Sequence, residues 1–281
     1  VNPASAAVLI WPSSRIVADS LACISATCCM VRRVRSSRSS SGMSRRMKLS
    51  DYDIIETANL NRIRAGLPDV GQLKAHVAAR QIWESNPYAN LDIYDKGINN
   101  DNLVNFLENP KPSVLFEAID DFVMKIKIRL EARKRLIPVV MLTSLGDNIL
   151  IDVERYDLNE RTPLFNGLIG DTPEEILREE IGDIQKIKYA IDIVGVDHIP
   201  TRALGSLLEI NKTLVGRPQL ASTVTIDGGI SAFIARQIIL GKTLSSGRYF
   251  ISLNEAMNSK LSNDLDRENI IAKLNQMLGR Q

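Results

Sequence analysis

Cysteine, histidine and long apolar runs are scarce in this chain of 281 residues. The three cysteines, Cys23, Cys28 and Cys29, all lie near the N-terminus, so the rest of the chain can form neither a disulfide framework nor a zinc ribbon. The two histidines, His76 and His198, have no metal-ligand pattern around them, which favours structural roles. No run of about 18 apolar residues is present, so we expect no membrane-spanning segment.

Glycine is absent before Gly42, and acidic residues are nearly absent from the same region. Residues 1–48 carry eight Arg or Lys against the single Asp19, whereas the rest of the chain carries 27 basic and 32 acidic residues, a net charge of −5. The acidic balance argues against nucleic acid as a partner of the folded part. Residues 1–46 are rich in Ser and Arg without a sustained hydrophobic period, so we interpret them as a disordered or artefactual leader. A transit peptide is the alternative.

Strand-like and helix-like patterns alternate from residue 47 onward. This alternation predicts an α/β fold with a mostly parallel, Rossmann-like sheet and helices on both faces. We expect strands at about 47–51, 91–94, 114–118, 137–142, 149–153 and 248–253. We expect helices at about 72–85, 101–109, 122–135, 183–192, 202–214, 229–240 and 264–278, with another beginning at Thr172-Pro173.

Acidic residues follow two of these strands, and cationic residues follow the first of them. Asp51 ends the first strand, and its carboxylate could bind the hydroxyls of a ribose. Arg62 and Lys74, farther along, could neutralise phosphates. Asp120 and Asp121 come after the strand at 114–118 and could hold Mg²⁺ through their oxygens. The pattern therefore predicts a nucleotide site at the carboxyl edge of a parallel sheet.

Each of these residues also has a simpler interpretation. Asn59 and Asn61 could cap the turn that contains Arg62 through bonds from side chain to backbone. Lys74 begins a helix, where the dipole disfavours a cation, so it would either point into solvent or bind a compensating anion. Asp120 or Asp121 could simply cap the helix that follows. Hydroxyls of Thr143 and Ser144 could line the same crevice, while Arg248 could pair with an acid.

Several separate blocks of the sequence resemble one family. Asp51-Tyr-Asp53, Asn59-Leu-Asn-Arg62, Gly71-Gln-Leu-Lys74 and Asn86-Pro87 are similar to the conserved run of the ThiF/MoeB/HesA superfamily, the ubiquitin-activating-enzyme-like adenylyltransferases. Further blocks resemble a bacterial branch in which the ThiF-like domain accompanies a nitroreductase-like domain; they lie at 137–144, 152–158, 163–170, 218–223 and 245–250. The resemblance covers roughly residues 47–255 and is followed by a C-terminal helix within 256–281.

The resemblance implies an adenylyltransferase that uses ATP and Mg²⁺. Asp51 and Asn59 would contact the nucleotide, Arg62 and Lys74 would stabilise its phosphates, and Asp120 would place the Mg²⁺. The substrate would be a carboxylate, either a small molecule or the C-terminus of a small carrier protein. Because relatives are usually dimers, we expect this chain to form a homodimer, and we expect it to be cytoplasmic. Because residues 30–281 contain no cysteine, the thioester or persulfide step of some relatives has no nucleophile there.

The chain departs from the family in its N-terminal region. Relatives place a first strand and a glycine-containing phosphate loop about 25 residues before the position of Asp51, but no glycine occurs before Gly42 here, so we expect this strand and its loop to be missing or replaced. Glu117 stands where relatives usually have Asp, and Asp121 replaces a common Asn. The alternative function is therefore a non-catalytic ThiF-like domain that acts as a scaffold or as the partner of a nitroreductase-like domain.

Overall fold

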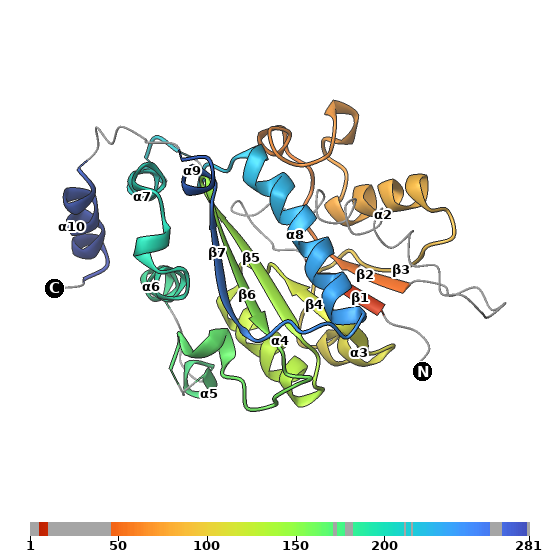
Figure 1. Cartoon of the computed structure of the whole chain (residues 1–281). Coiled ribbons are helices and arrows are strands. Elements are labelled where there is room, and N and C mark those ends of the chain that lie inside the picture. Colours follow the sequence, from red (N-terminus) through yellow and green to blue (C-terminus); the bar gives the residue numbers. More distant parts are fainter. Residues whose placement is uncertain are drawn as a thin grey trace.

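The computed structural model describes residues 6–10, 46–170, 173–177, 182–210, 212–214, 216–258 and 266–279 (Figure 1). Its strands are β1 Ala6–Ile10, β2 Arg46–Ser50, β3 Asn90–Tyr94, β4 Pro112–Glu117, β5 Val139–Leu145, β6 Asn148–Glu154 and β7 Gly247–Ser252. Its α-helices are α2 Lys74–Ser85, α3 Leu103–Glu108, α4 Phe122–Lys134, α5 Pro173–Ile176, α6 Asp183–Val194, α7 Thr201–Leu207, α8 Ala221–Ile239, α9 Leu253–Ala256 and α10 Arg267–Met277. The strands and helices predicted from residue 47 onward are confirmed, most of them with ends that differ by a few residues; α7 ends seven residues earlier and α8 begins eight residues earlier than expected.

The strands form one sheet in the order β3-β2-β1-β4-β5-β6-β7. Pairing is parallel from β3 to β5 and antiparallel from β5 to β7. The predicted mostly parallel α/β sheet is thus confirmed. Its antiparallel part begins with a hairpin in which Leu145 pairs with Asn148, and Gly146 adopts a φ of 63° in the two-residue turn. Such a turn favours glycine because its first central residue has a positive φ.

β1 corrects the expectation for the N-terminal region. Residues 6–10 belong to the segment interpreted as a leader, yet they form a strand in the interior of the sheet, paired in parallel with β2 on one side and β4 on the other. The strand expected to be missing is therefore present. The short apolar run of β1 was overlooked because no regular pattern of turns or helices surrounds it. The expected absence of a glycine loop concerns residues 11–45, which lie outside the described residues.

Helices cover both faces of the sheet because the strands bury side chains on both. Val114 and Phe116 of β4 pack in a cluster with α2 and α8, whereas Leu115 packs on the opposite face with α3 and α4. This alternation follows from the two-residue period of a strand. Figure 1 shows α8 lying across one face of the sheet, over β4, β5 and β6. None of the described helices is long and apolar enough to cross a bilayer.

A buried ionic network joins β4, α4 and β6. Arg129 of α4 is fully buried, its Nη1 pairs with Glu117 of β4, and its Nε donates to Glu154 of β6 at 2.8 Å. Tyr156 donates its hydroxyl to the other Glu154 oxygen at 2.6 Å, and Lys125 reaches Glu117 at 2.8 Å. Burial alone would raise the pKa of Glu117, but Arg129 and Lys125 outweigh it and hold that pKa below its usual value. Glu117 is thus ionised inside the fold, where it depends on its cationic partners.

A second ion pair ties the edge strand to its neighbour. Arg248 of β7 donates to both carboxylate oxygens of Asp152 on β6, at 2.9 Å and 2.8 Å, which confirms that Arg248 pairs with an acid. Because the Asp152 side chain is fully buried, this bidentate pair fixes the register of β7 against β6.

Beyond this edge, Leu274 of α10 packs in one cluster with Leu204 of α7. The C-terminal helix therefore contacts the rest of the fold.

Deleting residues 1–10 tests the position of β1. We expect the shortened chain to lose its cooperative unfolding transition, because β2 and β4 would both lose a paired neighbour in the interior of the sheet. Urea unfolding followed by circular dichroism measures this. A shortened chain with an unchanged transition would show instead that these residues are a dispensable leader.

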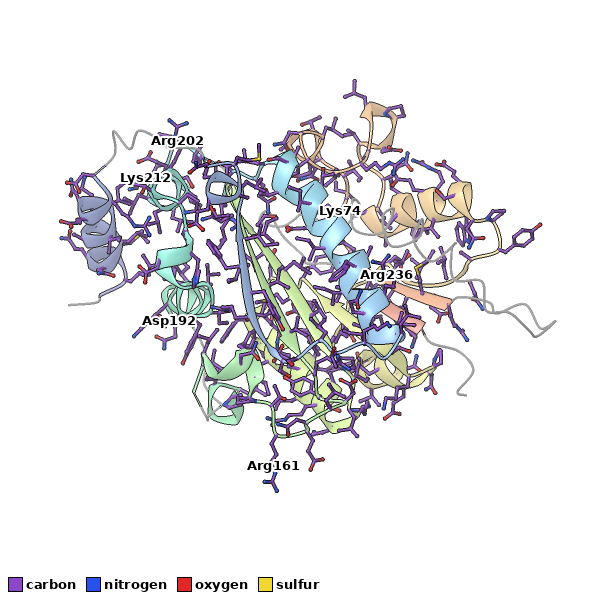
Figure 2. All side chains as sticks on the ribbon, viewed as in Figure 1. Lys74, Arg161, Asp192, Arg202, Lys212 and Arg236 are labelled. Carbon is purple, nitrogen blue, oxygen red and sulfur yellow. The ribbon has the colours of Figure 1, made fainter. Side chains whose placement is uncertain are left out.

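Replacing Arg129 by Met tests the buried network. The change leaves Glu117 and Glu154 buried without their shared cation, so we expect the free energy of unfolding to fall by about 3–5 kcal/mol. Arg161→Met, at an exposed position that Figure 2 shows projecting from the surface, is the matched control and should change it by less than about 0.5 kcal/mol. Equal stabilities of the two variants in urea titrations would contradict this account.

Candidate functional site

The carboxyl ends of β2 and β4 lie at the same edge of the sheet because both strands run parallel to β1 between them. Asp51 follows directly after β2, and Asp120 lies three residues after β4. Burial is the main reason that the pKa of Asp51 is raised to about 8; the charges of Asp53 and Asp120 act in the same direction, and Lys74 and the backbone hydrogen bond from Asp53 oppose them. Asp51 therefore lies within electrostatic range of Lys74, Asp53 and Asp120, and a joint role of these residues in a nucleotide site stays a prediction.

Asp51 has one oxygen in use and one without a partner. Its Oδ1 accepts a hydrogen bond from the backbone N–H of Asp53 at 2.8 Å. Its Oδ2 is buried and has no hydrogen-bond partner among the described residues, and the Oγ of the preceding Ser50 is in the same situation. Leaving a buried polar atom unsatisfied costs roughly 1–3 kcal/mol. Two such atoms in succession at the end of a strand are typical of a site that a polar ligand completes.

Lys74 is held inside the fold by Asp53. Its Nζ lies 2.9 Å from Asp53 Oδ2, and only 6% of its side chain is exposed. Its backbone N–H also donates to the carbonyl of Asp53 at 2.8 Å. The anion that compensates for a cation at the start of a helix is thus Asp53, a residue to which the sequence assigned no role. Figure 2 shows Lys74 among the elements of the fold, in contrast to Arg202 and Arg161 at its margins.

The two aspartates after β4 have different roles. Asp121 caps α4 by accepting a hydrogen bond from the backbone N–H of Met124 at 2.7 Å. Asp120 takes no part in that cap, and its Oδ2 is buried without a hydrogen-bond partner among the described residues. Burial raises the pKa of Asp120 to about 7, although Lys125 and Arg217 lower it. The capping alternative therefore applies to Asp121, and Asp120 remains the candidate to bind a ligand or metal.

The turn that carries Arg62 supports itself by hydrogen bonds. Asn59 is buried, and its Oδ1 accepts from the backbone N–H of Glu56 at 3.0 Å, as the capping interpretation predicts. Arg62 donates from Nη1 to the carbonyl of Ala58 at 2.8 Å and to Asn61 Oδ1 at 2.9 Å. These contacts hold the guanidinium on the loop between Asp51 and Lys74. A nucleotide role for Asn59 and Arg62 stays a prediction.

Several polar residues interact near the end of β5, and of these the sequence had pointed only to Ser144. Ser144 donates its hydroxyl to Asp227 of α8, and its carbonyl accepts from Arg217 Nη1 at 2.9 Å. The carbonyl of Gln219 accepts from Asn61 Nδ2 at 3.3 Å. The segment before α8 thus connects the end of β5 with the turn of Arg62. The only sequence signal was the block at 218–223, to which no chemistry could be attached.

The two histidines have ordinary partners. His76 Nε2 lies 3.1 Å from Asp95 Oδ2, and His198 Nδ1 lies 3.0 Å from the carbonyl of Val194. Within the described ranges, no group of three or more His, Cys, Asp or Glu side chains could hold a metal ion. Mg²⁺ requires no such group, since it commonly binds one or two carboxylates together with phosphates and water. The unsatisfied oxygen of Asp120 fits that requirement.

Solved structures share this fold at low sequence identity. A crystal structure of PaaA has 18% identity and a TM-score of 0.58, with 89% of this chain and 70% of that chain covered. A structure of Escherichia coli MccB with MccA-N7isoASN has 15% identity and a TM-score of 0.56, covering 89% and 62%. The structure of E. coli MccB with ATP has 16% identity and a TM-score of 0.52, covering 89% and 61%. At these identities, the likeness concerns the fold alone.

Sequence comparison gives the family. The chain is 35% identical over 212 residues to the uncharacterized protein MT1398 of Mycobacterium tuberculosis (strain CDC 1551 / Oshkosh), a match that covers 75% of this chain and 29% of that protein. The chain thus spans less than a third of this curated relative. The model of the ThiF family matches residues 39–268, which include every element from β2 to α9. The chain belongs to the ThiF family, as its sequence blocks suggested.

Proposed function

We propose that the chain is an ATP-dependent adenylyltransferase that activates a carboxylate. The observation that carries this proposal is a pair of carboxyl groups, the fully buried Asp51 and the half-buried Asp120, each with a buried oxygen that lacks a partner among the described residues. They lie at the carboxyl edge of a parallel sheet, where such folds bind nucleotides. Family membership and the MccB structures determined with ATP and AMPCPP support the same ligand.

Each site residue would contact a different part of the nucleotide. Asp51 would accept hydrogen bonds from the ribose hydroxyls through its unsatisfied Oδ2. Lys74, fixed by Asp53, and Arg62, on the adjoining loop, would neutralise the β- and γ-phosphates. Asn59 would support the site by holding the turn that carries Arg62. Asp120 would hold Mg²⁺, which when bound would offset the negative charge of the phosphates.

The reaction would consist of one displacement at the α-phosphorus. An oxygen of the substrate carboxylate forms the new bond to phosphorus, the bond to the bridging oxygen breaks, and pyrophosphate leaves with its electron pair. The products are an acyl-adenylate and pyrophosphate. The chain contributes mainly fixed positions and charge stabilisation, and loss of one well-placed contact typically costs roughly 10²–10³ in rate. We further propose that the chain works as a homodimer and that its substrate is the C-terminus of a ubiquitin-like carrier protein.

One observation favours the alternative of a non-catalytic scaffold. Residues 1–41 contain no glycine, so a phosphate loop there would have to approach the ligand without the residue that best permits close backbone contact. A scaffold, including one beside a nitroreductase-like domain, would keep the fold and lose the affinity for nucleotide. Measuring that affinity separates the two functions.

Calorimetric titration with Mg-ATP tests the proposed site. We expect the wild-type chain to bind, and Arg62→Ala to weaken binding by at least about tenfold because a charge-assisted contact to phosphate is lost. Arg161→Ala, at an exposed position away from the carboxyl edge, is the matched control and should stay within about twofold. Absence of binding by the wild type would support the scaffold. Binding that Arg62→Ala leaves unchanged would remove Arg62 from the site.

The pH dependence of stability tests whether the Asp51 carboxyl is buried with one oxygen unsatisfied. Its pKa is about 8 in the folded state against an ordinary 3.8, so between these values the folded state binds more protons than the unfolded state. The free energy of unfolding therefore falls as the pH rises through this range. From about pH 5.5 to about pH 8 we expect the wild type to lose at least about 1 kcal/mol more than Asp51→Asn.

Urea titrations at both pH values measure this difference. The exposed Asp101→Asn is the control, and it should follow the wild type. If Asp51→Asn and the wild type lose the same free energy of unfolding, the Asp51 carboxyl is solvated or paired, and the site is not preorganised as described.

A further inference from the structure

Arg217 is a further cation at the carboxyl edge, and the proposed nucleotide contacts assign it no role. We propose that Arg217 forms the subsite for the substrate carboxylate, beside Asp120 and across the sheet edge from Asp51. This inference rests on the proposed function and assigns the part of the site that receives the second reactant. The ligand class is a compound with a free carboxylate, such as the C-terminus of a peptide.

Arg217 is fixed at the edge of the sheet by its neighbours. Its Nη1 donates to the carbonyl of Ser144, the next-to-last residue of β5, at 2.9 Å. The hydroxyl of Ser144 donates to Asp227 of α8, and both of these residues are buried. The end of β5 thus holds the guanidinium before any ligand arrives, and Asp227 in turn holds Ser144. Such preorganisation lowers the entropy cost of binding.

The segment containing Arg217 bridges the two sides of the edge. Two residues after Arg217, the carbonyl of the buried Gln219 accepts a hydrogen bond from Asn61, next to Arg62. Burial is the main cause of the raised pKa of Asp120. Two cations act in the opposite direction and lower this pKa, and Arg217 is one of them. Arg217 therefore lies within electrostatic range of Asp120. It also remains partly exposed, so a ligand can reach it.

The order of the strands separates this cation from those assigned to phosphate. Along the sheet, β2 leads to Asp51 and Lys74, β4 leads to Asp120, and β5 ends beside Arg217. Lys74 and Arg217 thus belong to opposite sides of Asp120 in the strand order. A nucleotide that runs from Asp51 past Lys74 would leave the Arg217 side open to the second reactant.

The proposed reaction requires a cation at that place. It brings a carboxylate to the α-phosphorus of a polyphosphate, and two anions repel each other unless a positive charge lies between or beside them. A planar guanidinium matches a carboxylate with two parallel N–H···O bonds. Arg217 would hold one face of the carboxylate while an oxygen attacks phosphorus, and pyrophosphate would leave on the side of Lys74.

The test compares triglycine with triglycine amide as probes that differ only in the terminal carboxylate. Ligand-observed NMR titrations would be run on the full chain, without nucleotide and with saturating Mg-AMPCPP. We expect the wild type to bind the acid at least about fivefold more tightly than the amide, and Arg217→Met to reduce this ratio to about one. Arg217→Lys should keep part of the preference. Arg202→Met, at an exposed position on α7, is the matched control and should keep all of it.

The outcomes separate the subsite from the proposed function. Equal binding of acid and amide by the wild type, or an unchanged ratio in Arg217→Met, would overturn the subsite even if Mg-AMPCPP binds. A tenfold loss of Mg-AMPCPP affinity in Arg217→Met with an unchanged ratio would assign Arg217 to the nucleotide instead. If Mg-AMPCPP does not bind but the ratio falls in Arg217→Met, the subsite stands and the adenylyltransferase proposal fails. Unchanged circular dichroism of each variant shows that it is folded.

Discussion

Parallel pairing on both sides of β1 is the constraint on which the candidate site depends. Because β2 and β4 run in the same direction as β1, their carboxyl ends meet at one edge, and residues about 70 positions apart in sequence become neighbours there. Asp51 and Asp120 acquire their raised pKa values from this arrangement, since burial at the edge removes them from water. Without β1, the two strands would share no neighbour, and the carboxyl groups would have no reason to lie near each other.

The ionisable side chains inside this fold form two kinds of arrangement. Arg129, Glu117 and Glu154 satisfy one another through hydrogen bonds, so their charges stabilise a defined packing of α4 against the sheet. Asp51 and Asp120 each bury an oxygen that has no partner among the residues described, and removal from water raises the pKa of both. The first arrangement fits a structural role, and the second weakens the fold locally in the way that binding sites commonly do. This contrast distinguishes the proposed site from the rest of the charged interior.

Much of the fold could be predicted because local sequence patterns indicate where its helices and strands lie. Helices such as α2 and α4 and strands such as β4 and β5 show their apolar periods and end signals within a few residues. The strand β1 could not be recognised, because its five residues resemble any short apolar run and their pairing is with distant strands. Asp51, Lys74 and Asp120 could be chosen as candidates from the sequence alone, since acids and cations near strand ends can be recognised there.

The contacts between side chains could not be derived in the same way. That Asp53 neutralises Lys74, that Asp121 rather than Asp120 caps α4, and that Arg217 reaches the end of β5 all depend on three-dimensional positions. Family membership is established by the match over residues 39–268, but the chain covers only 29% of its curated relative MT1398. The proposed activity therefore depends on the geometry at the carboxyl edge of the sheet.

A crystal structure of the chain with Mg²⁺ and AMPCPP tests the central claim most directly. The account predicts that the ribose hydroxyls lie within hydrogen-bond distance of Asp51 Oδ2, that the triphosphate extends towards Lys74, and that Asp120 faces the metal. A nucleotide bound elsewhere, or an Asp51 carboxyl that stays without a ligand at saturating nucleotide, would contradict it.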